Sequence, residues 1–216
     1  MKRYQWLLFD LDGTLIHSHE GIYSCIRHAL KSMGETVFPT DDELRKTIGP
    51  PLEYTFSHFF GMSEERAVLA TQKYREKYKE TGVYENTLIG GVKEALTALK
   101  KAGYMLAVAT SKPAPFALKI AEQHGIKEYF QEIVGCGLDG SLPTKAAVIE
   151  EAIKRLGAKK EKTLMIGDRK HDIEGANANG VSVAIVNVGY AERDEFNAVK
   201  PDYLFQDFKA LTEALL

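Results

Sequence analysis

The feature that most constrains the fold is an alternation of short apolar segments with helical patterns along most of the chain. Each apolar segment is continuous, which is typical of a strand buried on both faces of a sheet. Such strands separated by helices predict a parallel α/β sheet covered on both faces, a Rossmann-like arrangement. The predicted strands are residues 6–9, 105–109, 133–134, 163–166 and 183–186, and the predicted helices are residues 92–101, 116–124, 145–156 and one starting near Asp172.

A helical segment interrupts this alternation between the first predicted strand and the rest. Apolar residues recur there at helical spacing, as at Ile22 and Ile26, and Thr40 followed by Glu43 has the pattern of a capping box. Because the first strand precedes this segment and the other strands follow it, the segment is predicted to be an insertion. We expect an α/β core of residues 1–15 and 85–216 and an inserted all-helical cap of residues 16–84.

Composition excludes several classes of protein. The 216 residues carry a net charge of −2 and the pI is about 6.3, so there is no basic excess to bind a nucleic-acid backbone. Two cysteines, Cys25 and Cys136, cannot form a disulfide framework. No apolar run approaches the ~20 residues of a membrane span, and the N-terminus does not have the pattern of a signal peptide. We therefore expect a soluble cytoplasmic protein with no nucleic-acid or membrane partner.

Polar residues follow the predicted strands and the start of one predicted helix. In a parallel sheet the carboxyl ends of the strands form the ligand-binding edge, so these residues are expected to share one site. Taken singly, each group also has a structural explanation: an Asp-Gly turn, a helix N-cap, a surface lysine or acids at a helix N-terminus. The four groups are Asp10-Leu11-Asp12-Gly13-Thr14, Thr110-Ser111-Lys112, Lys145, and Gly167-Asp168-Arg169-Lys170-His171-Asp172.

Taken together, the four groups predict phosphoryl chemistry. Several carboxylates at one sheet edge supply the hard oxygen ligands that Mg²⁺ prefers. A hydroxyl and an ammonium group can hold phosphoryl oxygens, and an aspartate that attacks phosphorus forms an aspartyl phosphate. Asp10 and Asp12 are also expected to lie close together, and two neighbouring carboxylates raise the pKa of one of them. One aspartate is then suited to act as the ionised group and the other to transfer a proton.

With these motifs the chain resembles the haloacid dehalogenase-like hydrolase superfamily, and within it the phosphoglycolate phosphatase branch. FDLDGTL at 9–15 resembles the first family motif, and ATSKP at 109–113 resembles the second. Lys145 and GDRKHD at 167–172 are similar to the third and fourth. The helical insertion resembles the small helical cap of the family, and IGPPLEYTF at 48–56 resembles its substrate-facing loop.

The resemblance implies roles for the first motif. Asp10 would be the nucleophile and a Mg²⁺ ligand. Asp12 would protonate the leaving oxygen and then deprotonate the hydrolytic water, and its backbone carbonyl would bind the metal.

The resemblance also implies roles for the remaining motifs. Thr110, Ser111 and Lys145 would bind the substrate phosphate, and Asp168 would be a Mg²⁺ ligand. Asp172 would act on the metal indirectly or through water.

Departures within the superfamily narrow the expected chemistry. Dehalogenases and phosphonate-cleaving members lack the second aspartate of the first motif, whereas Asp12 is present here. Mutases similar to β-phosphoglucomutase carry a histidine ten residues after that aspartate, where this chain has Ile22. Hydrolysis of a phosphate monoester remains. A non-catalytic phospho-acceptor module is the alternative from a different class, but receiver domains are shorter and their acceptor follows a later strand.

The substrate is less constrained. The resemblance favours a small acidic monoester such as phosphoglycolate, with Arg45, Gly49 and Pro50 of the cap as possible specificity residues. Alternatively, Tyr54 and Phe56 could stack on a base, which would make the enzyme similar to a 5′-nucleotidase. The structural alternative for these cap residues is that Arg45 and Lys46 form the exposed end of a cap helix while Tyr54 and Phe56 pack in the cap core. Both substrate hypotheses predict a small-molecule phosphate ester as the partner. We expect the protein to be a monomer or a homodimer.

Overall fold

The computed structural model describes residues 3–192 and 194–216, and the chain divides into two compact units. The first unit is Met1–His17 together with Leu88–Leu216, and the second is Ser18–Thr87. Within the described ranges, no helix is both long and apolar enough to cross a membrane.

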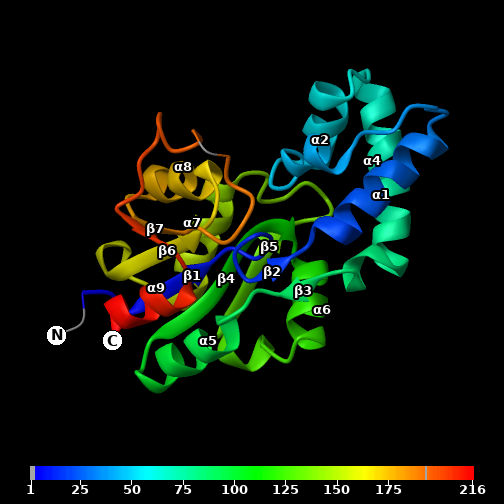
Figure 1. The fold of residues 1–216 in the computed structure, drawn as a ribbon. Helices are drawn as coiled ribbons and strands as arrows, with labels where there is room; N and C mark the ends of the chain where they lie inside the picture. The colour runs from blue at the N-terminus through cyan, green and yellow to red at the C-terminus, as the bar shows by residue number, and fades with distance from the viewer. Residues whose placement is uncertain (1–2, 193) are drawn as a thin grey trace. The chain divides into compact units, whose positions relative to one another are not determined.

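The first unit is built on a six-stranded sheet in the order β5-β4-β1-β6-β7-β8, with every neighbouring pair of strands parallel (Figure 1). This confirms the predicted α/β class and the parallel Rossmann-like sheet. The strands are β1 (Trp6–Phe9), β4 (Met105–Pro113), β5 (Glu132–Cys136), β6 (Thr163–Gly167), β7 (Ser182–Val186) and β8 (Tyr203–Phe205).

Five helices accompany the sheet among the described residues of the first unit. Helices α7 and α8 pack together on one face, and α5 packs with α9 on the other face, where α6 also lies (Figure 1). Their bounds are α5 (Val92–Lys101), α6 (Ala114–Gln123), α7 (Lys145–Leu156), α8 (Lys170–Asn179) and α9 (Phe208–Leu215), with short 3₁₀ turns at Lys127–Tyr129 and Lys160–Lys162.

Strand β1, at the centre of the sheet, is apolar along its whole length because helices cover both faces of the sheet. Every residue of β1 is buried, and Leu8 and Met165 belong to the cluster that packs beneath α7 and α8. From α7, Val148 and Ile149 enter the same cluster and are 0% exposed. Burial of one such side chain contributes roughly 1.5–3 kcal/mol, so this core holds the strands in register.

The second unit is helical. Helix α1 (His19–Ser32) packs along α4 (Glu64–Glu80), and α2 (Asp41–Arg45) begins at the predicted capping box of Thr40 and Glu43, which the structure confirms. The remaining helical segments are α3 (Leu52–Tyr54), a π-helical turn at Thr55–Phe59 and a 3₁₀ turn at Gly82–Tyr84.

A short two-stranded ribbon of β2 (Ile16–His17) and β3 (Thr87–Leu88) marks the two points where the chain passes between the units.

Two elements near the C-terminus were not predicted from the sequence. Strand β8 is a three-residue edge strand in which Leu204 is 55% exposed, so it lacks the continuous apolar pattern of a buried strand. Helix α9 is only eight residues long, although Asp207 caps it by accepting a hydrogen bond from the Ala210 amide at 2.8 Å.

Candidate active site

The sequence-predicted residues of the first unit meet at the carboxyl ends of three adjacent strands. Strand β1 lies between β4 and β6, and Phe9 is level with Val108 on one side and Ile166 on the other. Asp10 and Asp168 therefore leave the sheet at the same edge, close to Thr110 in β4. Parallel strands bring together residues that are more than a hundred positions apart in the sequence.

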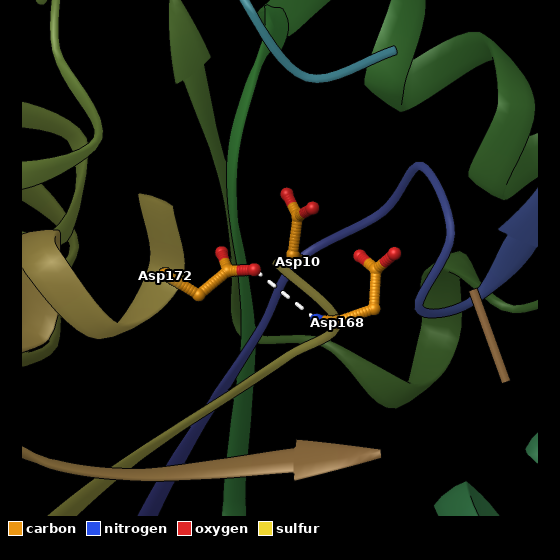
Figure 2. Close-up of side chains that lie close together, drawn as sticks. All are labelled: Asp10, Asp168 and Asp172. Atoms are coloured by element: carbon orange, nitrogen blue, oxygen red, sulfur yellow. Dashed lines mark hydrogen bonds between the residues drawn. The ribbon is translucent and has the colours of Figure 1, made fainter. Parts of the chain in front are cut away.

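Three buried carboxylates form the centre of this site. Asp10, Asp168 and Asp172 each place a carboxylate oxygen within 4.8 Å of the others, and none is more than 8% exposed. Figure 2 shows that the carboxylates of Asp10 and Asp168 point in the same direction, whereas that of Asp172 points to the backbone of Asp168. Asp10 and Asp168 thus present oxygens to one common space.

Lys145 offsets part of this negative charge. It is the first residue of α7 and is buried, with Nζ donating a hydrogen bond to Asp10 Oδ1 at 2.6 Å and to the Ala109 carbonyl oxygen at 3.1 Å. The same Nζ lies 2.8 Å from Asp172 Oδ1. A lysine at a helix N-terminus opposes the helix dipole, so these carboxylates are what stabilise its charge there.

Asp172 shapes the turn that follows β6. Its Oδ2 accepts hydrogen bonds from the backbone amides of Asp168 and Arg169, both at 3.1 Å. A side chain at Gly167 would overlap the Asp172 carboxyl group, so the close packing of this turn requires glycine. Asp172 therefore fixes the backbone from which Asp168 projects.

Asp168 is held by residues from two loops. Its Oδ1 accepts a hydrogen bond from Thr14 Oγ1 at 3.2 Å, and its Oδ2 accepts one from the Tyr190 amide at 2.7 Å. Gly13 passes so close that a Cβ would overlap Asp168 Oδ2, and its φ of +85° is one that other residues rarely adopt.

Asp12 forms a separate pair with Lys112. Lys112 Nζ donates to both Asp12 oxygens at 2.8 Å, and the side chains are 6% and 14% exposed respectively. Sequence reasoning placed Lys112 in the second polar group but assigned it no role. Because the strand was predicted to end at Ala109, strand alternation could not place Lys112 on the same side of the sheet as Thr110.

The predicted phosphate-binding residues Thr110 and Ser111 lie within β4 and not after it. The strand was predicted to end at Ala109, which is wrong: it continues to Pro113, with a register shift against β5 between Thr110 and Pro113. Thr110 is 1% exposed and its Oγ1 accepts the Lys112 amide at 3.2 Å, whereas Ser111 is half-buried.

Burial shifts the ionisation of the central groups. Burial is the largest influence on Asp10, and it outweighs the favourable charge of Lys145 to raise the pKa from 3.8 to about 6. Burial and the charges of Asp172 and Asp10 raise the pKa of Asp168 well above its ordinary value. For Lys145, burial disfavours the ammonium, but the adjacent carboxylates outweigh it and raise the pKa.

The charge balance fits a divalent cation. Three buried carboxylates against one buried ammonium leave two negative charges when all are ionised. Carboxylate oxygens are the ligands of hard cations such as Mg²⁺. Asp10 and Asp168 would hold the ion with their side chains, because Asp172 is turned to Lys145 and to the backbone amides.

The predicted specificity residues lie in the second unit. Arg45 is the last residue of α2 and is exposed, and Gly49, with φ of +110°, precedes the half-buried Pro50. Of the two aromatic residues considered for base stacking, Phe56 is 0% exposed, and Tyr54 is 48% exposed with its ring stacked on His58. Burial of Phe56 is a correction to its proposed stacking role, because its ring packs inside the helical unit.

Comparison with known proteins shows similarity along nearly the whole chain. Residues 7–186 match the sequence profile of the haloacid dehalogenase-like hydrolases. A 5′-nucleotidase of Pseudomonas aeruginosa is 41% identical over 213 residues, which is 99% of this chain and 96% of that protein. Tyrosine-protein kinase PtkA of Mycobacterium tuberculosis is 40% identical over 191 residues, 88% of this chain and 64% of its own length.

Solved structures agree with the sequence comparisons. The crystal structure of a predicted phosphatase from Clostridium acetobutylicum superimposes with a TM-score of 0.93 at 36% identity, covering 98% of this chain and 97% of that one. Proteins named phosphoglycolate phosphatase are also among the sequence relatives. One from Vibrio cholerae is 26% identical over 100% of this chain and 99% of its own length.

Proposed function

The chain belongs to the haloacid dehalogenase-like hydrolases and is a phosphatase of that family. We propose that it hydrolyses a small phosphate monoester with the help of Mg²⁺, and that the reaction passes through an aspartyl phosphate formed on Asp10. The observation that carries the proposal is the buried cluster of Asp10, Asp168 and Asp172 around Lys145. A merely structural cluster would have no reason to gather three buried carboxylates around one lysine.

In the first step an Asp10 oxygen attacks the phosphorus of the bound monoester. A bond forms between that oxygen and phosphorus while the bond to the leaving oxygen breaks, and Asp12 gives the leaving oxygen a proton. Thr110, Ser111 and Lys145 offer hydroxyl and ammonium donors to the phosphoryl oxygens.

In the second step water attacks the phosphorus of the aspartyl phosphate and Asp12 accepts its proton. The bond from phosphorus to Asp10 breaks, which releases inorganic phosphate and regenerates the carboxylate. Both carboxylate oxygens of Asp12 accept hydrogen bonds from Lys112 Nζ. At least one of them has to leave Lys112 before Asp12 can serve the leaving oxygen.

Mg²⁺, when bound, supplies positive charge that neutralises the phosphoryl oxygens and the surrounding carboxylates. The side chains of Asp10 and Asp168 and the backbone carbonyl of Asp12 are the proposed ligands. Asp172 and Thr14 keep Asp168 in place through the contacts described above.

A phosphoglycolate-like monoester is the first candidate substrate. Arg45 is the proposed partner for its carboxylate, and the adjoining loop Gly49-Pro50-Pro51 is stiffened by its two prolines. A nucleoside monophosphate is the second candidate. It is favoured by the 41% identity to the Pseudomonas aeruginosa 5′-nucleotidase and by the half-exposed ring of Tyr54. A non-catalytic phospho-acceptor is disfavoured by the presence of Asp12. Cytoplasmic location and a monomeric or homodimeric state remain predictions.

The test is hydrolysis of p-nitrophenyl phosphate and of a panel of phosphorylated metabolites, with and without Mg²⁺. We expect Mg²⁺-dependent phosphate release that falls to background in Asp10→Asn, which keeps the size of the side chain but removes the attacking charge. EDTA should abolish activity and added Mg²⁺ should restore it. Normal turnover by a folded Asp10→Asn protein would refute the mechanism, and full activity after exhaustive chelation would refute the metal.

A further inference from the structure

Glu195 is a buried acid outside the family motifs that holds the loop following β7. Its side chain is 5% exposed. Its two oxygens accept hydrogen bonds from Arg169 Nε at 2.8 and 3.0 Å. The Lys170 amide at 2.7 Å and the Glu192 amide at 3.1 Å are further donors. One carboxylate therefore joins the start of α8 to a loop more than twenty residues away.

The two chain segments joined by Glu195 are the two that flank Asp168. Arg169 directly follows Asp168, and Lys170 is the first residue of α8. On the loop side, the Tyr190 amide donates to Asp168 Oδ2 at 2.7 Å. Glu195 thus fixes the distance between the backbone that carries Asp168 and the amide that orients its carboxylate.

The loop also packs on Asp168 without any intervening side chain. A Cβ at Gly189 would overlap both Asp168 Oδ2 and the carbonyl oxygen of Gly13. The Asp168 carboxylate is therefore enclosed by two glycine-containing loops, and a small displacement of the Gly189 loop removes a hydrogen bond from it.

We infer that Glu195 is a positioning residue for the proposed metal site, acting through the Tyr190 amide to keep Asp168 in the orientation that binds the cation. This inference rests on the proposed function. Groups that orient a metal ligand without touching the metal typically change metal affinity 10–100-fold when they are removed.

The experiment compares Glu195→Gln with Glu192→Gln in the full chain. Glu195→Gln keeps the size of the side chain but removes its charge and one acceptor oxygen. Glu192 lies in the same loop, its side chain is exposed, and its hydrogen bond to Glu195 comes from its backbone amide. Because Glu192→Gln keeps that amide, it controls for the loss of one acidic charge in the loop. The melting temperature is measured against Mg²⁺ concentration, alongside the Mg²⁺ dependence of p-nitrophenyl phosphate hydrolysis.

We expect Glu195→Gln to raise the Mg²⁺ concentration for half-maximal stabilisation about tenfold, with kcat largely restored at saturating Mg²⁺. Glu192→Gln should stay within twofold of the wild type. If Glu195→Gln fails to fold, Glu195→Asp takes its place, because it keeps the charge but shortens the reach to Arg169, and a rise of at least threefold is then expected.

Two results would overturn the inference. A Glu195 variant that melts at a lower temperature yet keeps the wild-type Mg²⁺ half-saturation would show that Glu195 supports only the fold. A wild-type protein without any Mg²⁺-dependent stabilisation or hydrolysis would overturn the proposed metal site as well, so the two failures are distinguishable.

Discussion

Ionisation of Asp10 should make the metal-free protein less stable as the pH rises, which is the reverse of an ordinary salt-bridged aspartate. Its pKa is raised from 3.8 to about 6 by burial, against the opposing effect of Lys145. Between these pH values the folded state keeps a proton that the unfolded chain has lost. The free energy of unfolding therefore falls as the pH rises through this window.

The magnitude follows from the shift. Each tenfold change in proton affinity corresponds to about 1.4 kcal/mol, so a rise in the Asp10 pKa from 3.8 to about 6 corresponds to about 3 kcal/mol. The raised pKa of Asp168 acts in the same direction, and the part of that rise caused by the charge of Asp10 is also removed in Asp10→Asn. Comparison with Asp10→Asn isolates this contribution from the other acids of the chain.

The assay is urea unfolding in EDTA between pH 4 and pH 7.5, followed by the fluorescence of Trp6. Trp6 is the single tryptophan, is 7% exposed and is the first residue of β1, the strand that directly precedes Asp10, so it reports on the first unit. The wild type should lose about 3 kcal/mol relative to Asp10→Asn across this range.

Saturating Mg²⁺ should restore stability to the wild type at pH 7.5 and much less at pH 5, because protons compete with the cation. A difference between wild type and Asp10→Asn that changes by less than 1 kcal/mol with pH, or that changes in the opposite direction, would refute the reasoning.

Four further predictions concern single residues. Asp12→Asn should lose 10²–10⁴-fold in turnover of an alkyl phosphate but less with p-nitrophenyl phosphate, whose leaving group needs little protonation; equal losses would contradict the acid role. Lys145→Met leaves the negative charges of Asp10 and Asp172 without their lysine and should lower the free energy of unfolding in urea by about 3–5 kcal/mol. A loss below about 1 kcal/mol would contradict the buried pairing. Gly13→Ala should destabilise the fold and weaken Mg²⁺-dependent hydrolysis, because its Cβ would overlap Asp168 Oδ2; unchanged Mg²⁺ half-saturation and stability would argue against it. Arg45→Ala should raise KM for phosphoglycolate far more than for p-nitrophenyl phosphate, and nucleoside monophosphates turned over at least tenfold more efficiently than phosphoglycolate would shift the substrate class to nucleotides.

Several elements could be predicted because local patterns report them directly. The apolar run of β1 and the helix from Val92 to Lys101 have the bounds expected from the sequence. Helix α7 begins at Lys145, as expected, with the Thr144 side chain capping it by accepting the Ala147 amide at 3.2 Å. Burial on both faces requires a continuous apolar strand, so the sequence could show these strands without any knowledge of their neighbours.

Other elements depend on contacts that no local pattern records. Strand β8 lies at the edge of the sheet beside β7, so its residues need not be apolar. Strand β4 extends past Ala109 because it pairs with β5 through a register shift, which depends on the partner strand.

The sequence by itself determined the family, the parallel α/β core and the edge of the sheet at which Asp10, Thr110 and Asp168 lie. The core and the position of the site need only strand order and polarity, because the carboxyl ends of parallel strands share one edge. The family rests on the resemblance of the four motifs. Only the tertiary structure decided that Lys112 holds Asp12, that Asp172 turns to the amides of its own turn, and that Glu195 ties the loop of Tyr190 to Asp168. Which donor reaches which carboxylate depends on distances of about 3 Å between segments far apart in the chain, and spacing along the sequence does not contain those distances.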